Sequence, residues 1–178
     1  RTVFEYLRLA VVSMGYLPDF RALSGTAAEK REAFLAAKEA ISTNLGGVID
    51  VFGVSTGDAK GGAYYNRIIV KRANFTASFD TGPGTIFADN GDGTFSKFNT
   101  QGVRENVGYE IRCFASDTKW KRLMLQAVLK AFGNRKYIQV FDENWAATDE
   151  RLLILRTGSA NVSSVDYFEE LISYQIAD

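Results

Sequence analysis

Residues 107–132, VGYEIRCFASDTKWKRLMLQAVLKAF, decide the fold class of this chain of 178 residues. The first part, VGYEIRCFAS, is typical of a strand, and the run from Asp117 onward predicts a helix. Apolar side chains recur in this helix at the three- and four-residue spacing that builds one buried face. These residues are Trp120, Met124, Ala127, Val128, Ala131 and Phe132. The pattern predicts that the helix packs through this stripe on the sheet to which the strand belongs.

Two leucines of the same helix, Leu125 and Leu129, lie outside the stripe. A helix that is apolar on two sides is either enclosed in a large core or packed on its own sheet with its back against another chain. The size of this chain favours the second arrangement. We therefore take Leu125 and Leu129, together with the neighbouring basic residues Lys119, Lys121 and Arg122, as candidates for a protein–protein interface.

The rest of the chain predicts two more helices and a series of strands. Residues 1–15 carry apolar side chains at helical spacing, and residues 26–44 are rich in helix-forming residues and end at two glycines. From Val48 onward the composition is typical of strands, with glycine-rich turns at 57–62 and 82–84. Later strands are expected at about 103–115, 136–142, 151–157 and 165–177.

These elements predict a single α+β domain over residues 1–178. We expect a mixed, mostly antiparallel sheet with helices packed on one face and β-hairpin loops that project from it. Residues 45–100 are interpreted as an inserted or extended hairpin region, because glycine-rich segments there carry few side chains that could form a core.

The composition restricts the partners of the chain. The 46% of hydrophobic residues exclude a disordered chain. Lys plus Arg and Asp plus Glu both number 21, so no net charge draws the chain onto nucleic acid or an anionic membrane. The apolar runs are far shorter than the roughly 20 residues that span a bilayer. We expect no membrane partner and no sequence-specific nucleic acid.

The chain has no histidine, which removes the commonest general base and metal ligand. Its one cysteine, Cys113, lies in the middle of a predicted strand and is interpreted as a buried thiol. We expect no enzyme activity, and no catalytic, cofactor-binding or metal-ligating residues. Two other classes stay open: an enzyme that uses carboxylates without histidine, and a module that binds carbohydrate or nucleic acid through exposed aromatic residues.

Two loops imitate ligand sites. Asp89 to Thr94, DNGDGT, has the oxygen-rich side chains of a calcium loop but lacks the ligand spacing, and Asn-Gly and Asp-Gly are typical centres of hairpin turns. The stretch from Gly53 to Gly62 is glycine-rich like a phosphate loop, but no Lys-Ser or Lys-Thr pair follows its last glycine. We interpret both as loops between strands.

Charged residues gather in separate clusters along the second half of the chain. Basic residues occur at 119–122 and 135–136, and acidic residues at 142–143, 149–150 and 166–170. Solvated faces are the ordinary explanation of such clusters. Separated patches of opposite sign also suit head-to-side assembly of identical subunits.

The order of elements over residues 107–178 resembles that of phage tail terminator proteins, the small subunits that close the end of a long tail. The resemblance rests on a strand that leads into a long helix, two short strands, a polar link and an alternating closing strand. These segments are 109–112, 117–132, 137–140, 152–156, 161–166 and 171–176.

The resemblance implies a structural protein of the virion that forms a homohexameric ring in the tail or neck, after assembly in the host cytoplasm. The implied partners are copies of itself, the tail tube, neck proteins and, where one is present, a sheath. Another head-completion or connector subunit is the closest alternative.

Overall fold

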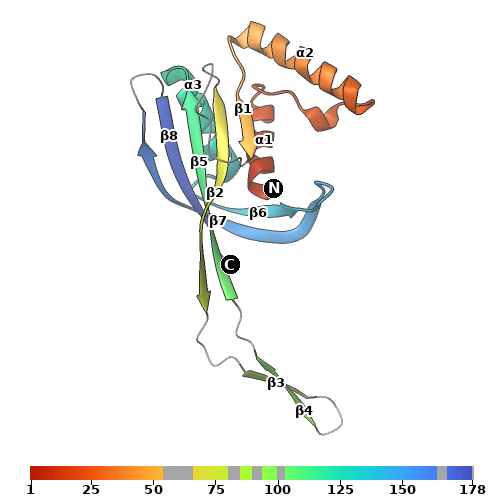
Figure 1. Cartoon of the computed structure of the whole chain (residues 1–178), viewed down its shortest axis with the longest axis vertical. Coiled ribbons are helices and arrows are strands. Elements are labelled where there is room, and N and C mark those ends of the chain that lie inside the picture. Colours follow the sequence, from red (N-terminus) through yellow and green to blue (C-terminus); the bar gives the residue numbers. More distant parts are fainter. Residues whose placement is uncertain (54–65, 80–84, 90–93, 100–102, 164–167, 178) are drawn as a thin grey trace.

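In the described part of the chain, a six-stranded sheet carries helices on one of its faces, and a separate sheet has two strands (Figure 1). The computed structural model describes residues 1–53, 66–79, 85–89, 94–99, 103–163 and 168–177. The helices are α1 (Thr2–Ser13), the short 3-10 helix η1 (Phe20–Ala22), α2 (Ala27–Leu45) and α3 (Thr118–Phe132). The strands are β1 (Asp50–Gly53), β2 (Arg67–Phe79), β3 (Thr85–Asp89), β4 (Phe95–Asn99), β5 (Val103–Ala115), β6 (Arg135–Phe141), β7 (Ala147–Asn161) and β8 (Phe168–Ala177).

The sheet has the strand order β1-β2-β5-β8-β7-β6, and within it only β1 and β2 run parallel. The predicted α+β class with a mixed, mostly antiparallel sheet is therefore confirmed. The sheet curls around α1 and α3, which lie side by side on its concave face (Figure 1). Because the strands alternate, Ile68, Ile111 and Ile172 are buried under these helices, whereas their neighbours Arg112 and Phe114 on the other face are partly exposed.

Helix α3 forms where the sequence predicts it. One capping residue favours its start and another favours its end. The side chain of Asp117 caps the first turn by accepting a hydrogen bond from the backbone N–H of Trp120 at 2.9 Å. The helix ends at Gly133, which has a positive φ of 58°. All six residues of the predicted stripe are buried, and Met124 and Phe132 have no exposed surface. The stripe is the face that packs on the sheet.

Helix α1 fills the opening of the curled sheet. Leu7 and Val11 are fully buried, and α1 contacts α3, β1 and β6. Two backbone N–H groups of β6 point away from β7 and donate to α1: Gln139 to the hydroxyl of Tyr6 at 2.8 Å, and Phe141 to Oγ1 of Thr2 at 3.2 Å. Helix α1 therefore closes this edge of the sheet as well as covering its core.

Helix α2 is a surface helix. None of its residues is buried. A capping box between Thr26 and Glu29 begins it, and Gly46 in the left-handed conformation ends it. An ion pair of 2.6 Å between Lys38 and Asp50 ties it to β1.

Strands β2 and β5 continue beyond the body of the protein as a two-stranded arm (Figure 1). Their ladder runs to the pair Phe79 and Val103, and β3 pairs with β4 between them in the sequence. Asp89 pairs with Phe95, so the DNGDGT segment joins two antiparallel strands. The residues of the predicted turns at 57–62 and 82–84, and residues 90–93, lie outside the described part of the chain.

Strand β7 is longer than the sequence suggests, beginning at Ala147 instead of about residue 151. The ladder with β6 is irregular there. Gln139 and Phe141 are two residues apart, whereas their partners Arg151 and Ala147 are four apart. The extra residues of β7 form a bulge, and a bulge breaks the alternation by which a strand is recognised.

We expect Met124→Ala to lower the free energy of unfolding by about 2–5 kcal/mol, because it leaves a cavity at a fully buried site between α3 and the sheet. The matched control is Leu129→Ala on the same helix, where the side chain is 48% exposed and the change should stay within about 0.5 kcal/mol. Chemical denaturation measures both. Equal midpoints for the two variants would contradict the assignment of the buried face.

Candidate interaction surfaces

The five predicted interface residues of α3 fall into an exposed group and a partly buried group. Lys119, Arg122 and Leu129 are exposed. Leu125 is partly buried and packs against the core. Lys121 is also partly buried, and its ammonium group pairs with Glu170 of β8 at 3.1 Å. The exposed group therefore forms the candidate surface, and Lys121 joins the helix to the sheet.

The α3 outer face, defined as Lys119, Arg122, Gln126, Leu129 and Lys130, is basic around one apolar side chain. Their spacing places these exposed residues on one side of the helix. Helix α3 contains no Asp or Glu, and its four Lys and Arg residues make it the most one-sided element in charge among the described helices. Such a face can bind an acidic surface that also covers Leu129.

A second charged surface lies on the hairpin between β6 and β7. The carboxylate of Asp142 accepts hydrogen bonds from the backbone N–H groups of Asn144 and Ala146, both at 2.8 Å, and so holds the turn. Trp145 in this turn has a positive φ of 63°. Such a conformation is costly for a bulky residue and persists only where the surroundings fix it.

The ring of Trp145 supplies that support. The guanidinium of Arg21 lies 3.9 Å from its centroid, and Phe4 of α1 packs edge-on against it at 6.1 Å. The backbone carbonyl of Asp142 also accepts a hydrogen bond of 3.0 Å from Arg1. The hairpin is therefore fastened to the N-terminal end of α1.

The acidic residues of this hairpin point into solvent. Glu143 follows the turn residue Asp142, and Asp149 and Glu150 lie on the bulge of β7. All three are exposed, and none forms an ion pair within the part of the chain that the structure describes. We call Glu143, Asp149 and Glu150 the acidic hairpin.

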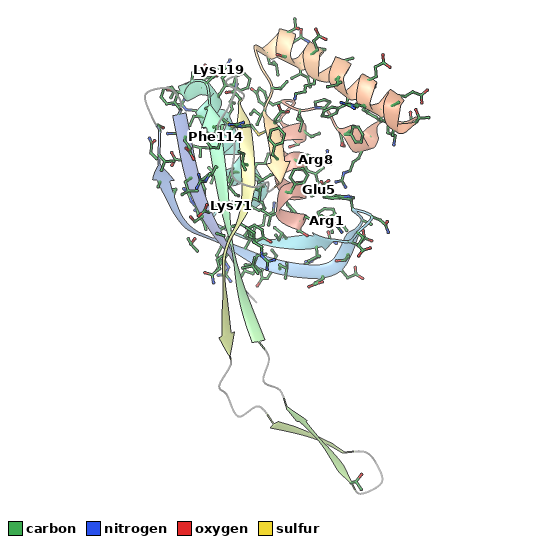
Figure 2. All side chains as sticks on the ribbon, viewed as in Figure 1. Arg1, Glu5, Arg8, Lys71, Phe114 and Lys119 are labelled. Carbon is green, nitrogen blue, oxygen red and sulfur yellow. The ribbon has the colours of Figure 1, made fainter. Side chains whose placement is uncertain are left out.

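A buried ion cluster on α1 includes Glu5 and Arg8 and was not expected from the sequence (Figure 2). Arg8 of α1 makes two bonds to Glu5, at 3.0 and 2.7 Å, and a third to Asp19 at 2.7 Å. Arg21 pairs with the second oxygen of Glu5 at 2.9 Å. Glu5 is 2% exposed. A charge this deeply buried needs such partners, and the cluster fixes the segment before α2 on α1.

The protonation of Asp19 makes the stability of this cluster depend on pH. Its partial burial raises the pKa of the carboxyl, but hydrogen bonds from Arg8 and from the backbone N–H of Arg21 outweigh that effect and lower the pKa below 3.8. The stabilising contribution of Asp19 is therefore complete above pH 3.8 and is lost as the pH falls through the lower, folded value.

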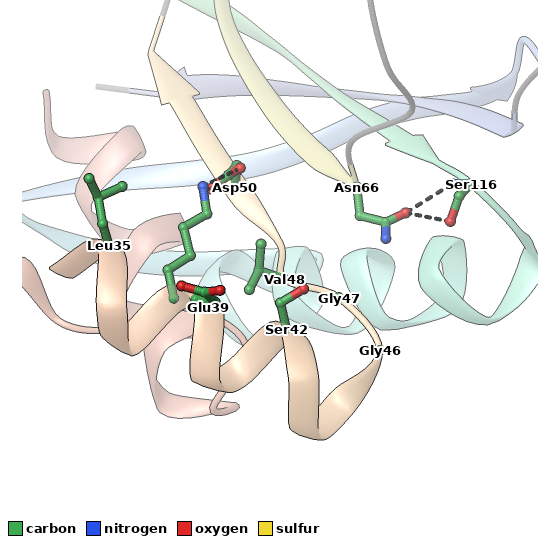
Figure 3. A pocket seen from close by; sticks show the side chains of 10 residues that line it. Leu35, Glu39, Ser42, Gly46, Gly47, Val48, Asp50, Asn66 and Ser116 are labelled. Carbon is green, nitrogen blue, oxygen red and sulfur yellow. Dashed lines mark hydrogen bonds and ion pairs between the residues drawn. The ribbon is translucent and has the colours of Figure 1, made fainter.

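A groove of about 510 Å³ lies between α2, the link from α2 to β1, and the residues Asn66 and Ser116 beside the sheet (Figure 3). Its polar groups are largely engaged with one another. Lys38 pairs with Asp50, and the side-chain oxygen of Asn66 accepts hydrogen bonds from the backbone N–H and the hydroxyl of Ser116, at 2.9 and 3.0 Å. These bonds join parts of the fold to one another. Among the described residues, the groove has no activated nucleophile.

Cys113 lies under α3 with no exposed surface. Burial, with a smaller effect of the nearby carboxylates of Glu170 and Glu169, raises the pKa of this thiol to about 12. Since the thiolate is the reactive form, the side chain is an inert part of the core, as the sequence predicts.

Across the described residues, no group of three or more Cys, Asp or Glu side chains is placed to hold a metal ion. A search of the helices described here finds none with the length and apolarity to span a bilayer. No protein-family model and no curated protein sequence matches the chain.

We expect Arg8→Ala to destabilise the fold by about 3 kcal/mol, because it removes the bidentate partner of buried Glu5 and leaves only Arg21. The control is Arg21→Ala, which keeps both bonds between Arg8 and Glu5 and should cost clearly less. Urea denaturation at pH 7 measures the two variants. A smaller loss for Arg8→Ala than for Arg21→Ala would contradict the described cluster.

Cys113 should resist thiol reagents in the folded protein, because its burial and raised pKa suppress the thiolate. We expect the native chain at pH 8 to remain unlabelled over the time in which the urea-unfolded chain reacts completely. A colorimetric disulfide reagent measures both rates. Comparable rates would show that α3 does not shield the strand beneath it.

Proposed function

We propose that this protein is a structural virion assembly protein, a tail terminator or neck subunit whose copies form a ring that closes a phage tail and joins it to the neck. The observation that carries the proposal is the outer face of α3. The buried stripe of this helix packs on the sheet. On the outer face of the helix, Leu129 is exposed among basic side chains. A face that carries basic groups and no acidic ones suits binding to an acidic protein surface, and the exposed leucine adds apolar area to such a contact.

The succession of elements in the second half of the chain adds support. Strand β5, helix α3, strands β6 and β7 and the closing strand β8 follow one another in the order on which the resemblance to tail terminators rests. The sheet brings β5 and β8 together as neighbours, so these elements form one unit with α3.

The projecting arm fits the same role. Strands β2 and β5 extend beyond the body as a two-stranded ribbon (Figure 1). A ribbon of this kind is suited to reach a neighbouring protein, because its far end lies outside the core that α1 and α3 cover. In the proposed ring, the arm contacts the tail tube or a neck protein, and the body contacts other copies.

The test is the mass of the purified full chain in solution, measured by light scattering, together with electron images. We expect a closed ring, with a mass of about 118 kDa for six copies of 19.7 kDa. Leu129→Asp should shift the protein toward the monomer, because it places a charge in the contact face.

The matched control is Leu35→Asp on α2, where the leucine is 54% exposed but lies outside the α3 outer face. It should leave the assembled mass unchanged, and circular dichroism should show both variants folded. A wild-type chain that stays monomeric at every concentration and salt tested, or that turns over a substrate as a monomer, contradicts the proposal.

A further inference from the structure

We infer that the acidic hairpin of one copy docks on the α3 outer face of the next copy. The inference rests on the proposed self-assembly and names the two surfaces that would meet. It places Asp149 and Glu150 of one protomer against Lys119 and Arg122 of its partner, with Leu129 covered between them.

The charges of the two surfaces are complementary. The α3 outer face carries Lys119, Arg122 and Lys130, and α3 has no acidic residue to offset them. The acidic hairpin carries three exposed carboxylates, and the exposed bases near its turn are Arg151, Arg1 and Arg21. Within the described residues, none of the Lys, Arg, Asp and Glu side chains that define the two surfaces forms an ion pair in its own protomer. Charge complementarity between exposed groups steers association and fixes its register.

The bulge in β7 gives the acidic residues their direction. In a regular ladder, Asp149 and Glu150 would point to opposite faces of the sheet. Here the hydroxyl of Thr148 donates to the carbonyl of Val140 at 3.0 Å and accepts from the backbone N–H of Glu150 at 3.3 Å. The two acidic residues lie in the stretch of β7 that has no ladder partner on β6, and both are exposed. Bulges commonly redirect side chains in this way.

Both surfaces are rigid before they meet. The hairpin is held by the Asp142 turn and by Trp145 against Arg21 and Phe4, and α3 is fixed by its buried stripe. Little conformational entropy is then lost on docking. The Leu129 side chain, 48% exposed, supplies apolar area that charged rims alone do not.

The two surfaces lie on different sides of the protomer. In Figure 1, α3 lies at the upper left behind the sheet, whereas β6 and β7 run toward the lower right. Figure 2 places Lys119 at the upper end of α3, away from Arg1, which bonds to the hairpin. A contact between two different surfaces is heterologous, and repeated contacts of this kind close into rings when the rotation permits.

Lys121 takes no part in this contact. Its ammonium group is used within the protomer by Glu170. A variant that changes Lys121 would alter the packing of α3 on β8 as well as any assembly, so the test leaves it untouched.

The experiment uses two variants of the full chain and their mixture. Lys119→Glu with Arg122→Glu reverses the α3 outer face, and Asp149→Lys with Glu150→Lys reverses the acidic hairpin. We expect each variant alone to assemble at least about tenfold more weakly than wild type, because like charges then face each other. Mixed in equal amounts, the two variants should assemble, since every contact between unlike copies again joins opposite charges.

Glu32→Lys with Glu39→Lys on α2 is the matched control. These residues are exposed, and the variant makes the same change in charge as the hairpin variant outside the proposed contact. It should assemble like wild type. Sedimentation velocity at low and physiological salt measures association, and circular dichroism verifies that every variant folds.

Rings that form equally well from wild type and from both reversed variants would overturn this interface while leaving the proposed ring in place. Assembly lost in both variants but not restored in the mixture would also overturn the pairing of these two surfaces. A wild-type chain that never associates would overturn the proposed function together with the inference.

Discussion

The rest of the structure depends on the position of α1. This helix covers the concave face of the sheet and also lies against its edge strand β6. Leu7 and Val11 fill the centre of the curled sheet. Thr2 and Tyr6 on the same helix accept the N–H groups that β6 would otherwise present to solvent. An open strand edge is a template for pairing with another chain. Because α1 occupies this edge, the proposed contacts between copies do not add a strand to β6.

The same helix determines how the acidic hairpin is presented. Its buried carboxylate, Glu5, requires Arg8 and Arg21, and Arg21 in turn stacks on Trp145 of the hairpin turn. These contacts connect the core to the hairpin through Glu5, Arg21 and Trp145. A cluster that costs desolvation energy is therefore accompanied by a fixed geometry at the surface. On the opposite side, the buried stripe of α3 fixes its basic face in the same way.

Much of the fold could be predicted from the sequence, because it depends on local periodicity. The buried stripe of α3 was predicted residue by residue, and the capping signals at Asp117 and Gly133 fix its ends. The start of β7 was predicted too late, because the bulge at Asp149 and Glu150 interrupts the alternation that marks a strand.

The electrostatic arrangement was less accessible. The pair between Lys121 and Glu170 joins residues far apart in the chain, and nothing local distinguishes Lys121 from Lys119. Glu5 and Arg8 are three residues apart on one helix, which is a usable signal, but the partners Asp19 and Arg21 follow only from the fold. The sequence therefore predicted a charged interface on α3, which stays a prediction, and the structure shows which of its residues are exposed.

The most direct test of the account is an electron cryomicroscopy map of particles assembled from the full chain. The account predicts a closed ring in which every α3 faces the β6–β7 hairpin of its neighbour, with the β2–β5 arm projecting from the ring. A map in which copies meet through identical surfaces in two-fold pairs, or through added strands at β6, would contradict it.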